Sequence, residues 1–486
     1  MKLSEILNDI EFELLSGDIN IEINGIQFDS RKIVVGDLFI CVEGFNMDGH
    51  RFIEKAMENG AKAIMCQKNL DISLYKEKIT FIKAPDTRKA MAKVAGNFYG
   101  HSDKKIKLIG ITGTNGKTTS TYMVKSILET AGYKVGVIGT VANYIGNKKI
   151  EAHRTTPEAI ELHELFHQMV EENIDYCVME ISSHSLVLQR VYGLEFEEAI
   201  FTNLTQDHLD FHLNFQNYYN AKKMLFLNSK NSIINYDDDY GKKLFDELDK
   251  HKLKYGVSKE CDVMATGISM HSKGIDFKLN YKDYAAEVFL GMPGSFNLSN
   301  ALCSAAACLN EGINIEIVAK GLSELTGVPG RCEVASKNLG LNYDIILDYA
   351  HSPDSLLKIL NTVREFTKEK IICVFGCGGD RDKTKRAEMG NIGTELSDYA
   401  IITSDNPRSE TPMEIIEDIL KGVKTNNYVV VENRKEAIKK AMNLAGKGDV
   451  VLIAGKGHED YQELKNGRIH FDEREIIAEI LKEAHC

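Results

Sequence analysis

No run of apolar residues in this 486-residue sequence approaches the ~20 residues that a transmembrane helix requires. Runs such as VVLIAG at 450–455 end within a few residues. The first residues, MKLSEILNDIEFELL, alternate acidic with apolar residues and lack the apolar core of a secretory signal. We therefore expect a cytoplasmic protein that does not insert into a membrane.

The sequence also lacks the cysteine pattern of a disulfide scaffold and an excess of basic charge. Its ten cysteines are scattered and form no CxxC pair, which favours reduced thiols, many of them buried. Lys and Arg number 59 against 71 Asp and Glu, so the net charge is -12. Nucleic acid and anionic membranes bind basic surfaces and are therefore disfavoured as partners, whereas a local phosphate site is compatible with this balance.

Changes of pattern along the chain predict three domains and no internal repeat. Residues 1–100 mix short apolar runs with helical stretches and end in a linker that contains glycine and lysine. Residues 101–330 alternate apolar strands with helices, which favours a parallel sheet covered on both faces. Residues 331–486 repeat that alternation after a glycine-rich stretch. We predict an α/β fold with a central parallel-sheet domain and a C-terminal Rossmann-like domain.

The strongest local signal is GITGTNGKTT at 110–119, between a predicted strand and a predicted helix. Backbone N–H groups of such a loop cradle phosphates, Lys117 reaches the β- and γ-phosphates, and Thr118 can hold Mg²⁺. The strict P-loop spacing would need glycine at 111, where Ile111 stands. The context still predicts ATP or GTP, and the absence of an NKxD guanine-reading motif disfavours a switch GTPase.

Acidic residues and histidines further along the same domain suggest a metal site. Glu180 ends a predicted strand, where a carboxylate would meet Mg²⁺ at Thr118. The stretch DHLDFH at 207–212 gathers two acids and two imidazoles, which fits a metal or general-base cluster as well as a solvated loop. His163-Glu-Leu-Phe-His167 matches the zinc-protease pattern HExxH, but it lacks the third histidine of a metzincin.

Two turns in the last third predict a pocket for a zwitterionic or acidic small molecule. FGCGGDR at 375–381 fails as a dinucleotide fingerprint because Arg381 occupies the last glycine position. DNPR at 405–408 follows a strand and offers Arg408, whose planar guanidinium suits a carboxylate. A third segment, GKGHE at 455–459, follows another strand.

Together these motifs resemble those of the Mur ligase family, and most closely the members that add an amino acid to UDP-N-acetylmuramoyl-L-alanyl-D-glutamate. The resemblance spans nearly the whole chain in an ordered set of segments. They are DSR at 29–31, TGTNGKTT at 112–119, TTP at 155–157, MEISSH at 179–184, TNLTQDHLDFH at 202–212, AKKMLF at 221–226, SFNLSNALCSAAA at 295–307, GVPGRCE at 327–333, DYAHSPDSL at 348–356, GCGGDRDKTKR at 376–386, DNPR at 405–408 and GKGHEDYQ at 455–462.

The resemblance implies three groups of binding residues. Implied contacts with ATP come from Gly113, Thr114, Asn115, Gly116, Lys117, Thr118, Thr119, Asn300, Arg331 and Asp348. Implied contacts with the UDP-muramoyl dipeptide come from Phe28, Ser30, the loop 44–49, Thr155, Thr156, Ser182 and Arg190. Implied contacts with the incoming amino acid come from Arg381, Asp405, Asn406, Pro407, Arg408, Gly455 and Glu459. Arg154 and Leu188 stand where relatives often carry Asn and Gln.

The same resemblance implies the cofactors and the catalytic residues, namely Lys117, Glu180, His208 and Lys222. ATP would phosphorylate the D-glutamate γ-carboxylate to an acyl phosphate, which the amine then attacks. Mg²⁺ would be held by Thr118, Glu180, His208 and Lys222, the last as a carbamate. Lys117 and Mg²⁺ would offset the negative charge that both steps bring together.

In the family, the DNPR form goes with meso-diaminopimelate, whose distal carboxylate pairs with the arginine. Because Arg408 would repel the ammonium of a lysine side chain, we expect diaminopimelate rather than L-lysine. We also expect a monomer. The alternatives left open are a lysine-adding ligase, a folylpolyglutamate-type ligase, a P-loop regulatory protein and a zinc peptidase that uses His163 and His167.

Overall fold

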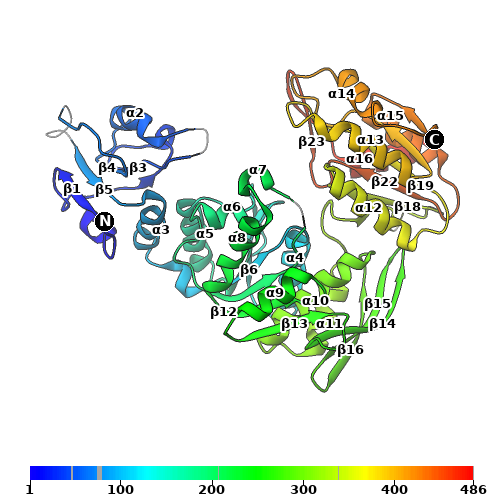
Figure 1. Ribbon diagram of the computed structural model, residues 1–486, viewed down its shortest axis with the longest axis horizontal. Coiled ribbons are helices and arrows are strands. Elements are labelled where there is room, and N and C mark those ends of the chain that lie inside the picture. The colour runs from blue at the N-terminus through cyan, green and yellow to red at the C-terminus, as the bar shows by residue number, and fades with distance from the viewer. Residues whose placement is uncertain (45–46, 74–78, 206, 338, 485–486) are drawn as a thin grey trace. The chain divides into compact units, whose positions relative to one another are not determined.

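The structure is a computed structural model that describes residues 1–44, 47–73, 79–205, 207–337 and 339–484, without the side chains of residues 209, 210 and 484. Figure 1 shows the chain coloured from blue at the N-terminus to red at the C-terminus. The chain forms two compact units. The first comprises residues 1–262 and 306–311, and the second comprises residues 263–305 and 312–486. Helix-covered sheets in the N-terminal, central and C-terminal parts confirm the predicted three-domain α/β fold.

The N-terminal sheet has the strand order β1-β5-β4-β3-β2, parallel except for β1. Its strands are β1 (Glu13–Ser16), β2 (Ile26–Gln27), β3 (Leu38–Ile40), β4 (Ala63–Cys66) and β5 (Thr80–Lys83). Its helices are α1 (Leu3–Ile6), α2 (Ile53–Glu58) and α3 (Thr87–Phe98), with short 3-10 turns at Ser30–Lys32, Gly49–Phe52 and Ser102–Lys105. Alternate residues of β3 and β4 enter separate apolar clusters, so both faces of this sheet are buried.

The central sheet of the first unit has the order β13-β12-β11-β6-β10-β7-β8-β9. Its strands are β6 (Lys107–Thr112), β7 (Val135–Ile138), β8 (Asn143–Ile145), β9 (Lys148–Ile150), β10 (Tyr176–Glu180), β11 (Phe196–Phe201), β12 (Ser229–Asn235) and β13 (Lys252–Gly256). From β13 to β7 the pairing is parallel, as predicted. The antiparallel β8 and β9 were not predicted, and they arise because short turns reverse the chain without a crossover helix.

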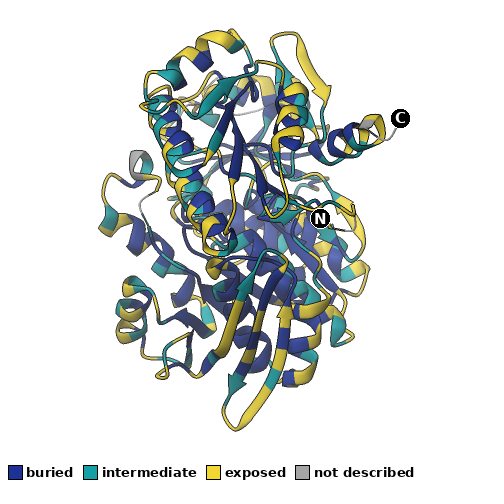
Figure 2. Ribbon diagram, turned by 90° about the vertical axis from the view of Figure 1, so that its right-hand side faces the viewer, coloured by how far each residue is buried: buried dark blue, intermediate teal, exposed yellow. Residues whose placement is uncertain are grey.

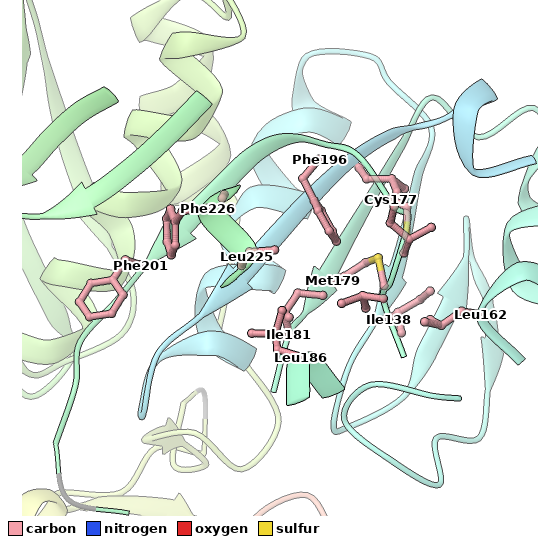
Figure 3. Close-up of a cluster of buried hydrophobic side chains, with 14 of the residues drawn as sticks. Ile138, Leu162, Cys177, Met179, Ile181, Leu186, Phe196, Phe201, Leu225 and Phe226 are labelled. Carbon is pink, nitrogen blue, oxygen red and sulfur yellow. The ribbon is translucent and has the colours of Figure 1, made fainter. Parts of the chain in front are cut away.

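Helices of the first unit bury the apolar faces of this sheet. They are α4 (Lys117–Thr130), α5 (Ala159–Glu171), α6 (Ser183–Val187), α7 (Leu209–His212), α8 (Phe215–Leu227) and α9 (Asp239–Glu247). Figure 3 shows Ile138 of β7, Met179 of β10, Leu162 of α5 and Leu225 of α8 in one buried cluster. This core fixes the carboxyl ends of β6, β7 and β10, where the predicted phosphate and metal residues lie.

The second unit contains an antiparallel meander and a second parallel sheet. The meander is β14 (Val263–His271), β15 (Gly274–Tyr281) and β16 (Tyr284–Leu290). The sheet has the order β17-β18-β22-β19-β20-β21, with β17 (Glu333–Val334), β18 (Asp344–Asp348), β19 (Ile371–Phe375), β20 (Tyr399–Ile402), β21 (Tyr428–Val430) and β22 (Val450–Ala454). The remaining elements are α10 (Ser295–Asn310), α11 (Ile315–Glu324), α12 (Pro353–Phe366), α13 (Thr384–Leu396), α14 (Pro412–Leu420), α15 (Arg434–Leu444), α16 (Glu473–Ala484) and the hairpin of β23 (Tyr461–Leu464) with β24 (Gly467–His470).

Strand residues of the C-terminal sheet alternate between two apolar clusters. Cys373 and Phe375 of β19 face the cluster of α12 to α14, whereas Ile372 and Val374 face that of α15 and α16. Figure 2 shows buried strands and helices whose outward faces are exposed. This two-sided burial requires the nearly continuous apolar runs that identified these strands in the sequence.

Two sequence-based expectations concern the whole chain. Nine cysteines are free and buried in the part of the chain that the structure describes, as the scattered spacing predicted. Within the same residues, no helix is long and apolar enough to cross a bilayer.

A buried carboxyl group lies in the central sheet, away from the predicted phosphate loop. Glu198 of β11 is fully buried, and its Oε1 accepts hydrogen bonds from Asn310 Nδ2 at 2.6 Å and Asn231 Nδ2 at 3.2 Å. The nearby carboxylate of Glu311 accepts from Lys107 Nζ at 2.8 Å and from the Tyr176 hydroxyl at 2.9 Å. Burial, together with the charge of Glu311, raises the pKa of Glu198 to about 8.

This raised pKa predicts a pH-dependent stability. Between the ordinary value of 4.5 and about 8, folded Glu198 keeps a proton that the unfolded chain releases. Its contribution is therefore complete at low pH and is lost as the pH rises through that window. Glu198→Gln stays neutral at every pH and escapes this loss. We therefore expect its free energy of unfolding, relative to that of the unmodified chain, to rise by roughly 3 kcal/mol between about pH 5.5 and 8.5.

Urea unfolding across this pH range measures the effect. The control is Glu197→Gln, because Glu197 directly precedes Glu198 but pairs with Lys230 at 2.7 Å on the surface. An identical pH dependence in the two variants would contradict the assignment.

Candidate active site

The phosphate loop joins β6 to α4, which begins at Lys117, so the predicted order of strand, loop and helix is confirmed. Gly113 has a φ of 151°, and a Cβ there would collide with the Thr202 hydroxyl. Gly116, with a φ of 88°, is the residue that precedes the helix. The loop therefore depends on glycine at both positions, and it presents the N-terminus of α4, which favours an anion.

Two lysines converge on this loop from different helices. Lys117 Nζ donates to the carbonyl oxygens of Gly113 at 2.9 Å and Thr114 at 2.8 Å. Lys222 Nζ of α8 donates to the same Gly113 carbonyl at 2.7 Å and lies over the ring of Tyr218. Burial, together with repulsion from Lys117, lowers the pKa of Lys222 well below its ordinary value. A neutral, nucleophilic amine is thus favoured at a position that is 2% exposed.

Glu180 is the centre of a hydrogen-bond network at the end of β10. Its Oε2 accepts from the hydroxyls of Thr118 at 2.9 Å and Thr140 at 3.0 Å, and its Oε1 accepts from the Thr140 backbone N–H at 2.8 Å. The Thr140 and Thr155 hydroxyls are 3.0 Å apart. The sequence argument missed Thr140, whose only signal is its position two residues after the end of β7. The oxygen set at Thr118 and Glu180 is of the kind that Mg²⁺ prefers.

The residues assigned to the muramoyl dipeptide adjoin this network. Thr156 donates to the Glu180 backbone carbonyl at 2.8 Å and accepts from the Ser182 N–H at 3.1 Å. Arg190 Nη1 donates to the Thr156 carbonyl at 3.0 Å, and its Nε lies 2.9 Å from the carboxylate of Glu158. The structure therefore brings Thr155, Thr156, Ser182 and Arg190 together in one region.

The residues assigned to the uridine nucleotide lie in the N-terminal domain. Ser30 is buried in the 3-10 turn that Asp29 caps, and Phe28 packs against the apolar cluster of α1 and α3. The loop 44–49 contains residues 45–46, which lie outside the described residues.

The histidines that the sequence singled out occupy three different settings. His208 lies 3.4 Å from Asp207 and packs against His184. His163 faces Asp103 at 3.6 Å, and burial lowers its pKa to about 4, whereas His167 is 3.6 Å from Glu171. Among the described residues, no group of three or more His, Cys, Asp or Glu could hold a metal ion. The HExxH pattern therefore has no zinc-ligand set there, and the side chain of Asp210 lies outside the description.

Three residues assigned to the nucleotide lie in the second unit. Asn300 is buried in α10 and donates to Asn297 Oδ1 at 3.3 Å. Asp348 ends β18, and its carboxylate accepts from the N–H groups of Cys332 at 2.8 Å and Ala350 at 2.9 Å. The guanidinium of Arg331 lies over the ring of Tyr349.

The predicted amino-acid site is built on the turn that follows β20. Gly379 packs so closely on this turn that a Cβ would collide with the Pro407 carbonyl. Arg408 has a φ of 51°, and its Nη1 donates to the Gly379 carbonyl at 2.7 Å. Asn406 Nδ2 donates to Glu459 Oε2 at 2.9 Å. The motifs FGCGGDR at 375–381 and GKGHE at 455–459 thus meet the DNPR turn. The side chain of Arg381 is exposed.

Two buried cations beneath this turn were missed by the sequence argument. Lys456 is fully buried and donates to Asn406 Oδ1 at 2.7 Å and to the Tyr461 carbonyl at 2.8 Å. Arg434 is also buried, pairs with Glu473 at 2.7 Å and lies 3.8 Å from Asp405. Burial opposes ionisation of Asp405, but Lys456 and Arg434 hold its pKa below the ordinary value. Lys456 stands inside the GKGHE motif, which was the available signal.

Comparison with known proteins matches these domains to one family. The model of the Mur ligase family catalytic domain matches residues 22–99, that of the Mur ligase middle domain matches residues 111–308, and that of the Mur ligase glutamate ligase domain matches residues 330–457. The chain belongs to the Mur ligase family. The matches cover both the phosphate loop and the DNPR turn.

Similar curated proteins align with this Mur ligase over its full length. A Clostridium acetobutylicum protein named UDP-N-acetylmuramoyl-L-alanyl-D-glutamate–2,6-diaminopimelate ligase 1 is 59% identical over 483 residues, which cover 99% of this chain and 100% of that protein. A Clostridium botulinum protein with the name UDP-N-acetylmuramoyl-L-alanyl-D-glutamate–2,6-diaminopimelate ligase is 57% identical over 484 residues. The alignment covers 99% of this chain and 100% of that protein.

Solved structures agree with this relationship. A UDP-N-acetylmuramoyl-L-alanyl-D-glutamate–2,6-diaminopimelate ligase superposes with a TM-score of 0.74 at 29% identity, covering 100% of this chain and 99% of that chain. A Mycobacterium tuberculosis folylpolyglutamate synthase superposes with a TM-score of 0.61 at 14% identity, covering 76% and 92%. The second likeness shows a shared fold alone.

The loop geometry predicts that Lys117 is required for nucleotide binding. Lys117→Met removes a cation that would neutralise phosphate charge. We therefore expect the Kd for ATP, measured by calorimetric titration, to rise at least about 10-fold. The control is Lys125→Met, because Lys125 is on the same helix but pairs with Glu129 at 2.6 Å. Equal affinity in the two variants would contradict the assignment.

Proposed function

We propose that this Mur ligase adds meso-diaminopimelate to UDP-N-acetylmuramoyl-L-alanyl-D-glutamate at the expense of ATP, in the synthesis of peptidoglycan precursors. The observation that carries the choice of amino acid is Arg408, held in the DNPR turn beside Asn406 and Glu459. The names of the full-length relatives support the same reaction. A carboxylate and an amine do not condense in water without activation, so ATP first converts the D-glutamate γ-carboxylate to an acyl phosphate.

In this proposal the phosphate loop, residues 113–119, binds the triphosphate. Lys117 offsets the charge of the transferred phosphoryl group as it approaches the substrate carboxylate. Thr118 and Glu180 fit Mg²⁺, because their oxygens are 2.9 Å apart in a buried setting. Bound Mg²⁺ would supply further positive charge for the same step. Asn300, Arg331 and Asp348 are proposed as additional contacts of the nucleotide.

Lys222 is proposed to act as a carbamate. Its lowered pKa favours the neutral amine, which is the form that reacts with carbon dioxide. The carbamate would replace this buried amine with an anionic oxygen ligand near Gly113. His208 completes the proposed metal and catalytic set, together with Thr118 and Glu180.

The muramoyl dipeptide is proposed to bind along Thr155, Thr156, Ser182 and Arg190. These residues adjoin Glu180, so the substrate carboxylate would lie next to the proposed Mg²⁺ site. Phe28, Ser30 and the loop 44–49 would bind its uridine nucleotide. We infer domain boundaries of 1–100, 101–330 and 331–486, a cytoplasmic location and a monomer.

Diaminopimelate carries a second amino-acid centre that lysine lacks. Arg408 would pair with its distal carboxylate, and Asn406 and Glu459, which are hydrogen-bonded to each other, are proposed to contact its polar groups. Arg381, Asp405, Pro407 and Gly455 are proposed to complete this site. The ammonium of lysine would meet the guanidinium of Arg408 instead, which disfavours it.

The proposed function predicts which amino acid supports turnover. Phosphate release is measured with the purified chain, ATP, Mg²⁺ and UDP-N-acetylmuramoyl-L-alanyl-D-glutamate, with meso-diaminopimelate or L-lysine as the amine. We expect release with diaminopimelate alone. Release with lysine would support the ligase reaction but contradict the predicted preference for diaminopimelate. Release with neither amine would contradict the proposed ligase reaction itself.

The arginine itself gives a second prediction. Arg408→Ala should raise the KM for diaminopimelate by about 10- to 100-fold, because a charge-assisted pair with the distal carboxylate is lost. The Kd for ATP should not change. Arg364→Ala is the control, because Arg364 pairs with Asp398 at 2.6 Å on the surface. If the Kd for ATP of Arg408→Ala rose as much as its KM for diaminopimelate, Arg408 would not act on the amino acid alone.

A further inference from the structure

Arg408 is tied to Glu463, a residue that lies outside the motifs considered above. Arg408 Nε donates to Glu463 Oε2 at 2.9 Å. The Arg408 backbone N–H also donates to the Glu463 carbonyl oxygen, at 3.0 Å. Glu463, which lies in the β23–β24 hairpin, thus holds both the backbone and the side chain of Arg408. The proposed choice of amino acid depends on that arginine.

Glu463 is itself held in place by the site. Its backbone N–H donates to Asn406 Oδ1 at 2.9 Å, on the same oxygen that accepts from Lys456. It lies on β23, opposite Arg468 of β24, whose Nε is 3.8 Å from Glu463 Oε1. The guanidinium of Arg468 in turn lies over the ring of Tyr461. The hairpin therefore presents the Glu463 carboxylate in a fixed position.

The contacts of Arg408 leave one side of its guanidinium for a ligand. Nε is bound by Glu463, and Nη1 donates to the Gly379 carbonyl. Within the described residues, no hydrogen bond of Nη2 is found. The Arg408 side chain is 22% exposed, so a carboxylate can reach it from solvent. Because arginine has many rotamers, a partner at Nε that fixes the plane lowers the entropy lost when a ligand binds.

We propose that Glu463 is a positioning residue for the incoming amino acid: it holds the guanidinium of Arg408 so that its Nη groups meet the distal carboxylate of diaminopimelate. This inference rests on the proposed function. It extends the site by a residue that acts through Arg408 and does not itself touch the substrate. Its role depends on accepting the Nε–H bond and not on its charge.

The test is steady-state kinetics of the full-length chain, with ATP and UDP-N-acetylmuramoyl-L-alanyl-D-glutamate saturating and meso-diaminopimelate varied. Glu463→Ala should raise the KM for diaminopimelate about 10-fold, with kcat and the KM for ATP within about 2-fold of the unmodified chain. Glu463→Gln should stay within about 3-fold in KM, because its amide oxygen still accepts from Nε. Glu475→Ala is the control, since Glu475 pairs with His470 of the same hairpin at 2.6 Å.

A double variant tests whether Glu463 acts through Arg408. In an Arg408→Ala background, Glu463→Ala should change the KM for diaminopimelate by less than about 2-fold. A further rise there would overturn the proposal, as would an unchanged or lowered KM in Glu463→Ala alone. Equal impairment of Glu463→Gln and Glu463→Ala would overturn it by showing a charge effect. No turnover by the unmodified chain would instead overturn the proposed function, and this inference with it.

Discussion

A carboxylate that is removed from water needs hydrogen-bond donors, a cation or a proton, and this constraint shapes each buried acidic group described above. Glu180 is satisfied by the two hydroxyls and one N–H that Thr118 and Thr140 supply. Asp405 has the cations Lys456 and Arg434. Glu198 has two amide donors and a raised pKa, so it keeps its proton. Each of these three carboxyl groups therefore holds in place the strands and loops that supply its hydrogen-bond donors or cations.

The two candidate sites use the same architectural principle. In both, side chains gather at the carboxyl ends of parallel strands, where loops of a helix-covered sheet are free to carry function. The first site brings a loop after β6, a threonine after β7 and the end of β10 to one network. The second brings turns after β19, β20 and β22 together with the β23–β24 hairpin. Because the loops after β6, β7, β10, β19, β20 and β22 are anchored in buried strands, their polar groups are held with little freedom.

Much of this arrangement could be predicted from the sequence. The runs IKLIGIT and IICVFG form strands because they are apolar on both faces, which only a covered sheet requires. The antiparallel β8–β9 hairpin and the β14–β16 meander were not predicted. Their strands are short or half-exposed, so no apolar run marks them. The DHLDFH stretch fits several chemistries, and spacing alone does not choose among them.

The sequence by itself determined the α/β class, the phosphate loop and the residues of the DNPR turn, because these depend on local runs, glycine positions and neighbours in the chain. Only the tertiary structure decided which distant groups complete the sites. Thr140 reaches Glu180 across 40 positions, and Glu463 reaches Arg408 across 55. Such pairs leave no periodic signal, since they depend on strand order and on the packing that brings separate loops to one edge of a sheet.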